Sequence, residues 1–540
     1  MIPRLELPAS RWLLALVALA FLLPGLTGHE PWKTYDAVAI EIISQMQRTG
    51  DWLVPRIAGE PWIEDPPLYH WVGLLFASLL GWALPLHGAV RLASAMFVLV
   101  ALWLIHHAAG RAAASGQEQS AGATAAMVLL GSSGLFVHAH EAVPDLATLA
   151  AMCAALAFAT HFANQAPVAG FGIGMSLGAG FLATGPVAPV AMGLAILAGA
   201  LVCSEWRNRR VGLSLGVAVA VATLVAATWT LALAWRAPAQ SAEWWSLALQ
   251  SRGEPVENLR YYAVTAGWFT WPAWPLAAWA VWAARRQMTS PAVFVPLAAL
   301  VLSFAGISIA GPAQDINTIA LLPPLAMLAA QGVPHLRRGA ESALDWFGVM
   351  TFTLFAGLVW LGYAAMTWGV PPRIARNFAK SAPGFEGQFE WWPFAIALGL
   401  TLAWAYVALF TPPSPTRGVT RWAAGVALLW GTLAMLWFPW ADYQKSYRGV
   451  AQQLQSRIPA GTRCVARIGV GSAQRAALSY HAGIRTQPFD RARPSSCPLL
   501  LVQGSARHER DAPGPAWVKL ADVGRPGDKG ERLRLYRHRP

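Results

Sequence analysis

Charged side chains are scarce in this chain: they make up 12% of its 540 residues, whereas hydrophobic side chains make up 56%. This composition excludes an ordinary soluble protein of the same length and indicates multiple membrane spans. Acidic residues are also fewer than basic ones, 27 against 40, which gives a formal charge of +13. That charge does not favour nucleic-acid binding, because the arginines lie in short loops between apolar runs and in the C-terminal tail.

Cysteine is also rare, with four residues in the whole chain. Cys153 and Cys203 lie within apolar runs, so we expect them to be buried small hydrophobic side chains. Cys464 and Cys497 lie in the polar tail, where an oxidising compartment would allow them to form a disulfide.

Apolar runs of span length recur along the first 440 residues. The candidates lie near 12–28, 68–84, 88–108, 121–140, 145–163, 168–183, 186–203, 211–235, 262–284, 291–310, 316–332, 346–368, 392–410 and 421–440. Arginine-rich connectors place alternate loops in the cytoplasm, which leaves one candidate too many. The segment 68–84 is rich in Trp and Tyr and suits a helix in the membrane interface. About thirteen spans remain, the first of them an uncleaved span rather than a signal peptide.

After residue 440 the composition becomes polar and basic. Alternating patterns at 464–470 and 498–502 predict strands, and the stretch 473–481 between them predicts a helix. The predicted fold is therefore an all-α polytopic membrane bundle over 1–440 and a small α/β domain over 441–540. The count of spans places this domain and the loop 29–67 on the external side, which is the periplasm in a bacterial inner membrane.

The loop 29–67 is dense in polar and aromatic side chains, and external loops of this length are usually functional. Apolar residues recur at helical spacing from 37 to 48, which predicts an amphipathic helix lying on the bundle. Asp36 then lies at the N-terminus of this helix, where a carboxylate is stabilised by the helix dipole. A helix-capping role and a catalytic role are both open for Asp36, and the two are compatible.

Three ordered motifs in this loop resemble those of the aminoarabinose transferase family: Lys33-Thr34-Tyr35-Asp36, Gly50-Asp51-Trp52-Leu53-Val54-Pro55 and Glu64-Asp65-Pro66-Pro67. Downstream, the segments 138–146 and 181–186 also resemble family motifs. The sequence departs from the family at two positions. Tyr35 stands where the family has the first carboxylate of an acidic pair, and Thr184 stands where it has the lysine of a Lys-Gly-Pro segment.

The resemblance implies a C-type membrane glycosyltransferase that displaces a polyprenyl phosphate from the anomeric carbon of a sugar. Such a reaction needs a carboxylate that accepts a proton and cations that stabilise the leaving phosphate. Asp36 is the first candidate for the carboxylate, with Asp145 as a supporting acid and Glu30 as an alternative base. The candidate cations are Lys33, Arg56 and Arg260, although an arginine at the membrane interface also serves simply to reach the lipid headgroups.

The acidic and histidine residues Glu64, His138, His140 and Glu141 form a candidate site for a divalent metal ion, with ligands that suit zinc or manganese. His138 and His140 are two positions apart, so on a regular helix their side chains point in different directions. The alternative is a polar external helix end with no cofactor.

The predicted function is the transfer of a hexosyl or pentosyl group from an undecaprenyl-phosphate-type donor to a periplasmic acceptor. The acceptor is lipid A, another glycan or a protein, and membrane lipids rather than nucleic acid are the expected surroundings. A glycolipid transporter or flippase is an alternative, which would place charges inside spans and pair halves with broken helices. A non-catalytic membrane scaffold is a third possibility, because two family motifs are incomplete.

Overall fold

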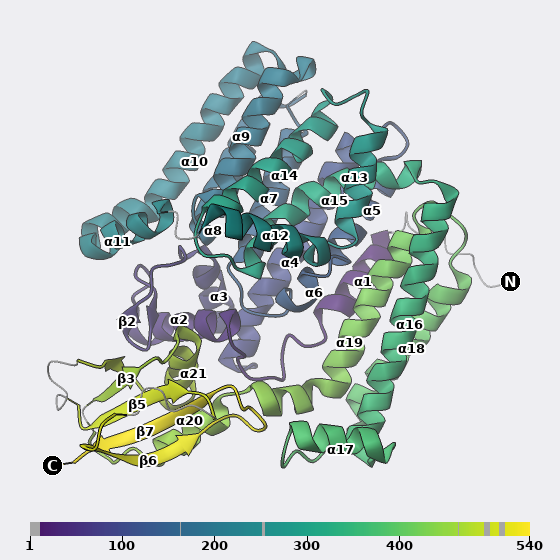
Figure 1. Cartoon of the computed structure of the whole chain (residues 1–540). Helices are drawn as coiled ribbons and strands as arrows, with labels where there is room; N and C mark the ends of the chain where they lie inside the picture. The colour runs from purple at the N-terminus through teal and green to yellow at the C-terminus, as the bar shows by residue number, and fades with distance from the viewer. Residues whose placement is uncertain are drawn as a thin grey trace.

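The computed structural model describes residues 11–162, 164–250, 254–462, 464–490, 497–506 and 513–539. A helical bundle occupies most of the chain, and a small sheet domain follows at the C-terminus (Figure 1). The sheet domain lies at one end of the bundle, where its helix α21 (Ser472–Ala482) packs against α2 (Tyr35–Thr49). The predicted fold class is therefore confirmed.

Eight segments of the described residues are long and apolar enough to cross a membrane, and four shorter apolar helices accompany them. Whether the number of spans is thirteen stays a prediction. The helices of the bundle beyond the first loop are α1 (Arg11–Leu22), α4 (Leu86–Ala112), α5 (Glu118–Leu130), α6 (Leu135–His138), α7 (Asp145–Ala159), α8 (Ala166–Thr184), α9 (Val187–Val202), α10 (Arg209–Arg236), α11 (Pro238–Leu249), α12 (Pro255–Phe269), α13 (Ala273–Ala283), α14 (Pro291–Ile309), α15 (Leu322–Gly332), α16 (Arg338–Trp368), α17 (Pro372–Ser381), α18 (Trp391–Phe410) and α19 (Arg417–Lys445). Short 3-10 helices lie at η1 (Ser204–Trp206), η2 (Asp315–Leu321) and η3 (Val333–His335).

Two of the predicted continuous spans are broken in the structure. The run 121–140 divides into α5 and α6, and the run 262–284 divides into α12 and α13. The two breaks lie against each other: the backbone N–H of Ser133 donates to the carbonyl of Trp271 at 2.9 Å, and that of Gly134 donates to the carbonyl of Phe269 at 2.7 Å. Non-helical backbone is tolerated within a membrane bundle when neighbouring protein satisfies its polar groups. Here the two breaks form hydrogen bonds with each other.

The first external loop forms α2, the short strands β1 (Arg56–Ile57) and β2 (Glu60–Pro61), and α3 (Leu68–Leu80). The predicted amphipathic helix is confirmed as α2, whose apolar residues from Ala37 to Met46 are buried except for the half-buried Val38. Gly50 ends this helix in the left-handed conformation, with φ of 70°, which glycine adopts at little cost. The segment predicted to lie in the interface forms α3, which packs between α2 and α4.

The C-terminal domain contains α20 (Arg448–Gln455), α21 and a five-stranded sheet with the order β4-β3-β5-β7-β6. Its strands are β3 (Val465–Ile468), β4 (Gln487–Pro488), β5 (Leu499–Gly504), β6 (Trp517–Val523) and β7 (Arg532–His538). β3 runs parallel to β4 and β5, whereas β7 is antiparallel to β5 and β6. The two strands and the helix predicted in this region are thus confirmed, and Cys464 and Cys497 form a disulfide.

The disulfide between Cys464 and Cys497 determines how many free thiols the chain should have. The denatured chain should show two free thiols, those of Cys153 and Cys203, before reduction and four afterwards, as measured by titration with a thiol reagent. The Cys464→Ser variant should lower the free energy of unfolding of the domain by about 3 kcal/mol, because the bridge closes a loop of 33 residues. Four free thiols in protein isolated without reductant would contradict the bridge.

Candidate active site

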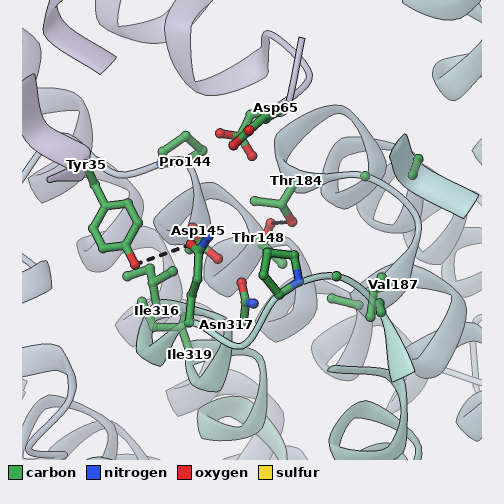
Figure 2. Close-up of a pocket in the computed structure, with 18 of the residues that line it drawn as sticks. Tyr35, Asp65, Pro144, Asp145, Thr148, Thr184, Val187, Ile316, Asn317 and Ile319 are labelled. Atoms are coloured by element: carbon green, nitrogen blue, oxygen red, sulfur yellow. Dashed lines mark hydrogen bonds between the residues drawn. The ribbon is translucent and has the colours of Figure 1, made fainter. Parts of the chain in front are cut away.

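A cavity of about 470 Å³ opens between α2, the segment before α3 and the starts of α7 and α9. Figure 2 shows polar side chains from several of these elements facing one another across it. Its size falls in the range of pockets that hold small ligands. The polar and titratable residues that line it are Thr34, Tyr35, Glu64, Asp65, His70, Asp145, Thr148, Thr184, Gln314, Asn317 and Ser472.

Asp145 is the candidate acid that the structure places in this cavity (Figure 2). It is the first residue of α7, directly after Pro144, and both residues line the cavity. Proline fixes the backbone angle that begins a helix, and the positive end of the helix dipole favours a carboxylate in the first turn. The local sequence therefore presents the Asp145 carboxylate at the cavity.

Two further carboxyl groups, those of Glu64 and Asp65, enter the cavity from the end of the first loop. Burial, together with the nearby carboxylates of Asp145 and Glu64, raises the pKa of Asp65 to about 8. At neutral pH Asp65 is therefore mostly protonated and acts as a hydrogen-bond donor.

Tyr35 lines the cavity at the position where the resembled family has its first carboxylate. Its hydroxyl lies 3.4 Å from Oε1 of Gln314 and 3.3 Å from Oδ1 of Asp315. Burial and the carboxylate of Asp315 raise the pKa of Tyr35 well above its usual range, so the hydroxyl stays protonated and donates a hydrogen bond. Tyr35 can position a substrate but cannot replace a carboxylate base.

Asp36, the first candidate for the catalytic base, is not among the residues that line the cavity. Its carboxylate forms an ion pair with Arg91 of α4, with 2.6 Å between Oδ2 and Nη2, and both side chains are at most 1% exposed. It also accepts hydrogen bonds from the backbone N–H groups of Trp32 and Ala142. Burial alone would raise the pKa of Asp36, but Arg91 holds it below its usual value. Asp36 is therefore a buried anion in the first turn of α2, where Thr34 is the N-cap residue, and its catalytic role stays a prediction.

The carboxylate of Glu30, the alternative base, is paired with basic side chains outside the cavity. One of its carboxylate oxygens lies 2.8 Å from Nη2 of Arg448, and the other lies 3.8 Å from Nδ1 of His481. Both partners belong to the C-terminal domain. Glu30 thus contacts that domain and does not face a substrate.

The three candidate phosphate-binding cations do not line the cavity. Lys33 pairs with Glu531 of the C-terminal domain at 2.9 Å. Arg56 lies 3.6 Å from the carboxylate of Asp51, and Arg260 is exposed on α12. Among the described residues that line the cavity, none is a lysine or an arginine.

Thr184, which stands in place of the family's lysine, lines the cavity close to the start of α9 (Figure 2). Its hydroxyl forms a hydrogen bond of 2.8 Å with that of Thr148 on α7. The residues after Thr184, namely Gly185, Pro186 and Val187, also line the cavity. This wall is therefore neutral, with hydroxyl groups and the N-terminus of α9 rather than a cationic side chain.

The four candidate metal ligands do not come together. Nδ1 of His138 lies 3.1 Å from Oε2 of Glu141, but Nε2 of His140 forms a hydrogen bond with the carbonyl of Phe21, and the His140 ring stacks on Trp430. The two histidines diverge because their two-residue spacing turns them to different sides. Within the ranges that the structure describes, no three His, Cys, Asp or Glu side chains are grouped as a metal site requires. A divalent metal ion at these residues therefore stays a prediction, and the described side chains do not form a ready-made site for it.

The segments 260–262 and 315–324 resemble segments of the family, but the sequence alone predicts no role for the polar group that they form before α15. The hydroxyl of Tyr262 accepts hydrogen bonds from the backbone N–H of Gln314 and from the side-chain amide of Asn317, at 3.2 and 2.9 Å. Gln314 and Asn317 both line the cavity. The sequence signal was a polar stretch after Gly311 and Pro312 between two apolar runs, which marks a break in the helices.

The Asp36–Arg91 pair generates a stability prediction. The Arg91→Met variant should lose about 3–5 kcal/mol of unfolding free energy, because a buried carboxylate is left without its counter-charge. The pKa of Asp36 is lower in the folded than in the unfolded chain, so the contribution of the pair is present at neutral pH and is lost as pH falls below the unfolded value of about 4. Thermal unfolding in detergent at several pH values measures this. Equal stability of the two proteins at pH 7 would contradict it.

The titration of Asp65 should change the stability of the protein with pH in the opposite direction. Its folded pKa of about 8 exceeds its unfolded value, so the folded chain holds a proton that the unfolded chain releases. Between about pH 4 and pH 8 the wild-type protein should lose stability with rising pH relative to Asp65→Asn, which cannot titrate. Parallel unfolding curves of the two proteins across this range would show that Asp65 is already ionised.

Comparison with known proteins supports the resemblance. No family model matches the chain. The chain is 24% identical over 430 residues to the undecaprenyl phosphate-alpha-4-amino-4-deoxy-L-arabinose arabinosyl transferase of Pectobacterium carotovorum, covering 75% of this chain and 74% of that protein. It is 29% identical over 378 residues to the transferase of the same name from Pseudomonas savastanoi, covering 66% of this chain and 67% of that one.

Solved structures agree with these relatives. The structure of ArnT from Cupriavidus metallidurans bound to undecaprenyl phosphate matches with a TM-score of 0.70 and 18% identity, over 97% of both chains. An oligosaccharyltransferase from Archaeoglobus fulgidus matches with a TM-score of 0.53 and 10% identity, over 91% of this chain and 68% of that one. The resemblance seen in the first loop is thereby confirmed: the chain has the fold of the solved ArnT structure and is similar in sequence to the aminoarabinose transferases.

Proposed function

We propose that this chain is an integral membrane glycosyltransferase that moves a sugar from a polyprenyl-phosphate donor to an acceptor outside the cytoplasm. The observation that carries the proposal is the cavity at the start of α7, into which the first loop, α9 and η2 all bring polar groups around the Asp145 carboxylate. The related transferases are named for an undecaprenyl-phosphate-linked aminoarabinose, and a solved structure of this fold is bound to undecaprenyl phosphate. These facts favour a lipid-linked sugar as donor.

In the proposed reaction, an oxygen of the acceptor attacks the anomeric carbon of the sugar. The bond between that carbon and the phosphate oxygen breaks, and the polyprenyl phosphate leaves with the electron pair. The acceptor is lipid A, another glycan or a protein. When it attacks through a hydroxyl group, its proton passes to the carboxylate of Asp145, which is the general base.

The leaving phosphate needs stabilisation in a cavity whose described lining has no lysine or arginine. The hydroxyl pair of Thr148 and Thr184 supplies one hydrogen-bond donor, because the other hydroxyl proton is used within the pair. The first residues of α9 supply backbone N–H groups at the positive end of a helix. The protonated carboxyl of Asp65 adds a donor of the same kind. These neutral hydrogen-bond donors take the role of the lysine that the resembled family has at the position of Thr184.

Localisation is part of the proposal. We place the chain in the bacterial inner membrane, with the first loop and the C-terminal domain in the periplasm. The Cys464–Cys497 disulfide supports this placement, because such bridges persist in oxidising compartments.

The test is release of free polyprenyl phosphate by purified protein supplied with polyprenyl-phosphate sugars and candidate acceptors. Asp145→Asn should lower the rate of release by about 10²- to 10⁴-fold, as expected when a general base is lost. Glu118→Gln is the matched control, because that carboxylate is exposed and hydrogen-bonds only to its own turn. Unchanged release by Asp145→Asn would remove Asp145 from the mechanism, and no release by the wild-type chain with any donor would favour the transporter or scaffold alternatives.

A further inference from the structure

The C-terminal domain is joined to the first loop by carboxylates that lie between them. Glu60 of β2 receives both terminal nitrogens of Arg467, at 2.8 and 2.7 Å, and also contacts Arg475. Both arginines belong to the C-terminal domain, and their side chains are largely buried. Bidentate pairing between arginine and a carboxylate fixes orientation as well as distance. The strand pair β1–β2 is therefore held in one orientation against the domain.

A second contact between the first loop and the C-terminal domain is centred on Glu531. Oε2 of Glu531 accepts hydrogen bonds from Nζ of Lys33 at 2.9 Å and from Nε2 of Gln474 at 3.0 Å, while Oε1 accepts from the hydroxyl of Tyr447 at 2.5 Å. Glu531 is almost fully buried. Burial alone would raise its pKa, but these donors hold it below its usual value, so the carboxylate stays charged. Of its three partners, Lys33 alone belongs to the first loop.

The contact between Lys33 and Glu531 and the helix α21 are both next to residues that line the cavity. Lys33 immediately precedes Thr34 and Tyr35, which line it, so the position of Lys33 limits where these two residues lie. Ser472, the first residue of α21, lines the cavity itself. The C-terminal domain thus supplies one wall residue and anchors the segment that supplies two more.

We propose that the C-terminal domain is a working part of the catalytic cavity: Glu531 is a positioning residue that holds Tyr35 in place through Lys33, and Ser472 bounds the space for the acceptor. This inference rests on the proposed function, because only a transferase has an acceptor for Ser472 to meet. The domain lies outside the bundle, so a group that meets Ser472 approaches from the water side, whereas the polyprenyl chain of the donor remains among the apolar helices (Figure 1).

The first experiment compares hydrogen exchange of the first loop in full-length wild type, Glu531→Gln and Asp522→Asn. Glutamine keeps the shape of Glu531 and removes its charge, so the protein should stay folded while the backbone of residues 33–49 exchanges faster. Asp522 is the matched control, because its carboxylate pairs only with Arg532 and Arg534 inside the domain. Unchanged exchange in the Glu531→Gln loop, or equal acceleration in both variants, would overturn the proposal. This readout does not require activity, so it separates failure of the inference from failure of the proposed function.

The second experiment measures transfer kinetics of Glu531→Gln, Lys33→Gln and the double variant. Each single change should lower kcat by roughly ten- to a hundredfold, as expected when a catalytic group is misplaced by about 1 Å. The double variant should be no worse than the singles, because the two residues act through one contact. Ser472→Trp should raise KM for the acceptor and leave KM for the donor unchanged. Additive losses in the double variant, or a Ser472→Trp effect on the donor alone, would contradict the assigned roles.

Discussion

The ion pair between Asp36 and Arg91 holds together the segments on which the cavity depends. Arg91 also donates hydrogen bonds to the backbone carbonyls of His29 and Glu30, and Asp36 accepts one from the N–H of Ala142. One buried pair therefore ties the start of the first loop, α2, α4 and the turn before α7 to a single point. Because Tyr35 and Asp145 stand next to these tied segments, their separation across the cavity is set by the pair. A buried pair of this kind is worth little as net stability but is costly to break on one side, which suits a positioning role.

The same pair explains what the sequence could and could not predict about the site. The helix α2 and the motif-bearing loop that carries Tyr35, Glu64 and Asp65 followed from periodicity and motif order. Which of two adjacent residues faces the cavity did not follow, because it depends on Arg91, which is distant in sequence from Asp36. A lone arginine near the start of an apolar run was the missed signal, since a charge there normally has a partner.

The fold, like the site, could be predicted from the sequence only in part. Strands β3 and β5 and helix α21 were predicted because alternation and helical spacing are local patterns. The breaks at Ser133 and Trp271 were not, because the apolar composition continues through them and each is stabilised by hydrogen bonds to the other. The pairing of Lys33 could not be predicted for a related reason: its partner Glu531 is distant in sequence, and only the folded chain brings the two together.

The site that emerges differs from the pattern of the resembled family in its charges. Tyr35 replaces one carboxylate, Thr184 replaces a cation, and the titratable lining that the structure describes consists of Tyr35, Glu64, Asp65, His70 and Asp145. A charged donor phosphate must then be held by hydroxyls, a protonated carboxyl and the N-terminus of a helix, which stabilise an anion less than a lysine does but keep the cavity compatible with the nearby acids.

The most direct test of this account is the position of the donor phosphate in a cryo-electron microscopy structure of the chain in a lipid nanodisc with a polyprenyl-phosphate sugar. The account predicts the phosphate beside Thr184 and the first residues of α9, with the sugar between Tyr35 and Asp145 and the lipid chain leading out among the helices. A phosphate bound instead at Lys33, Arg56 or Arg260, or an empty cavity with the donor elsewhere on the bundle, would contradict it.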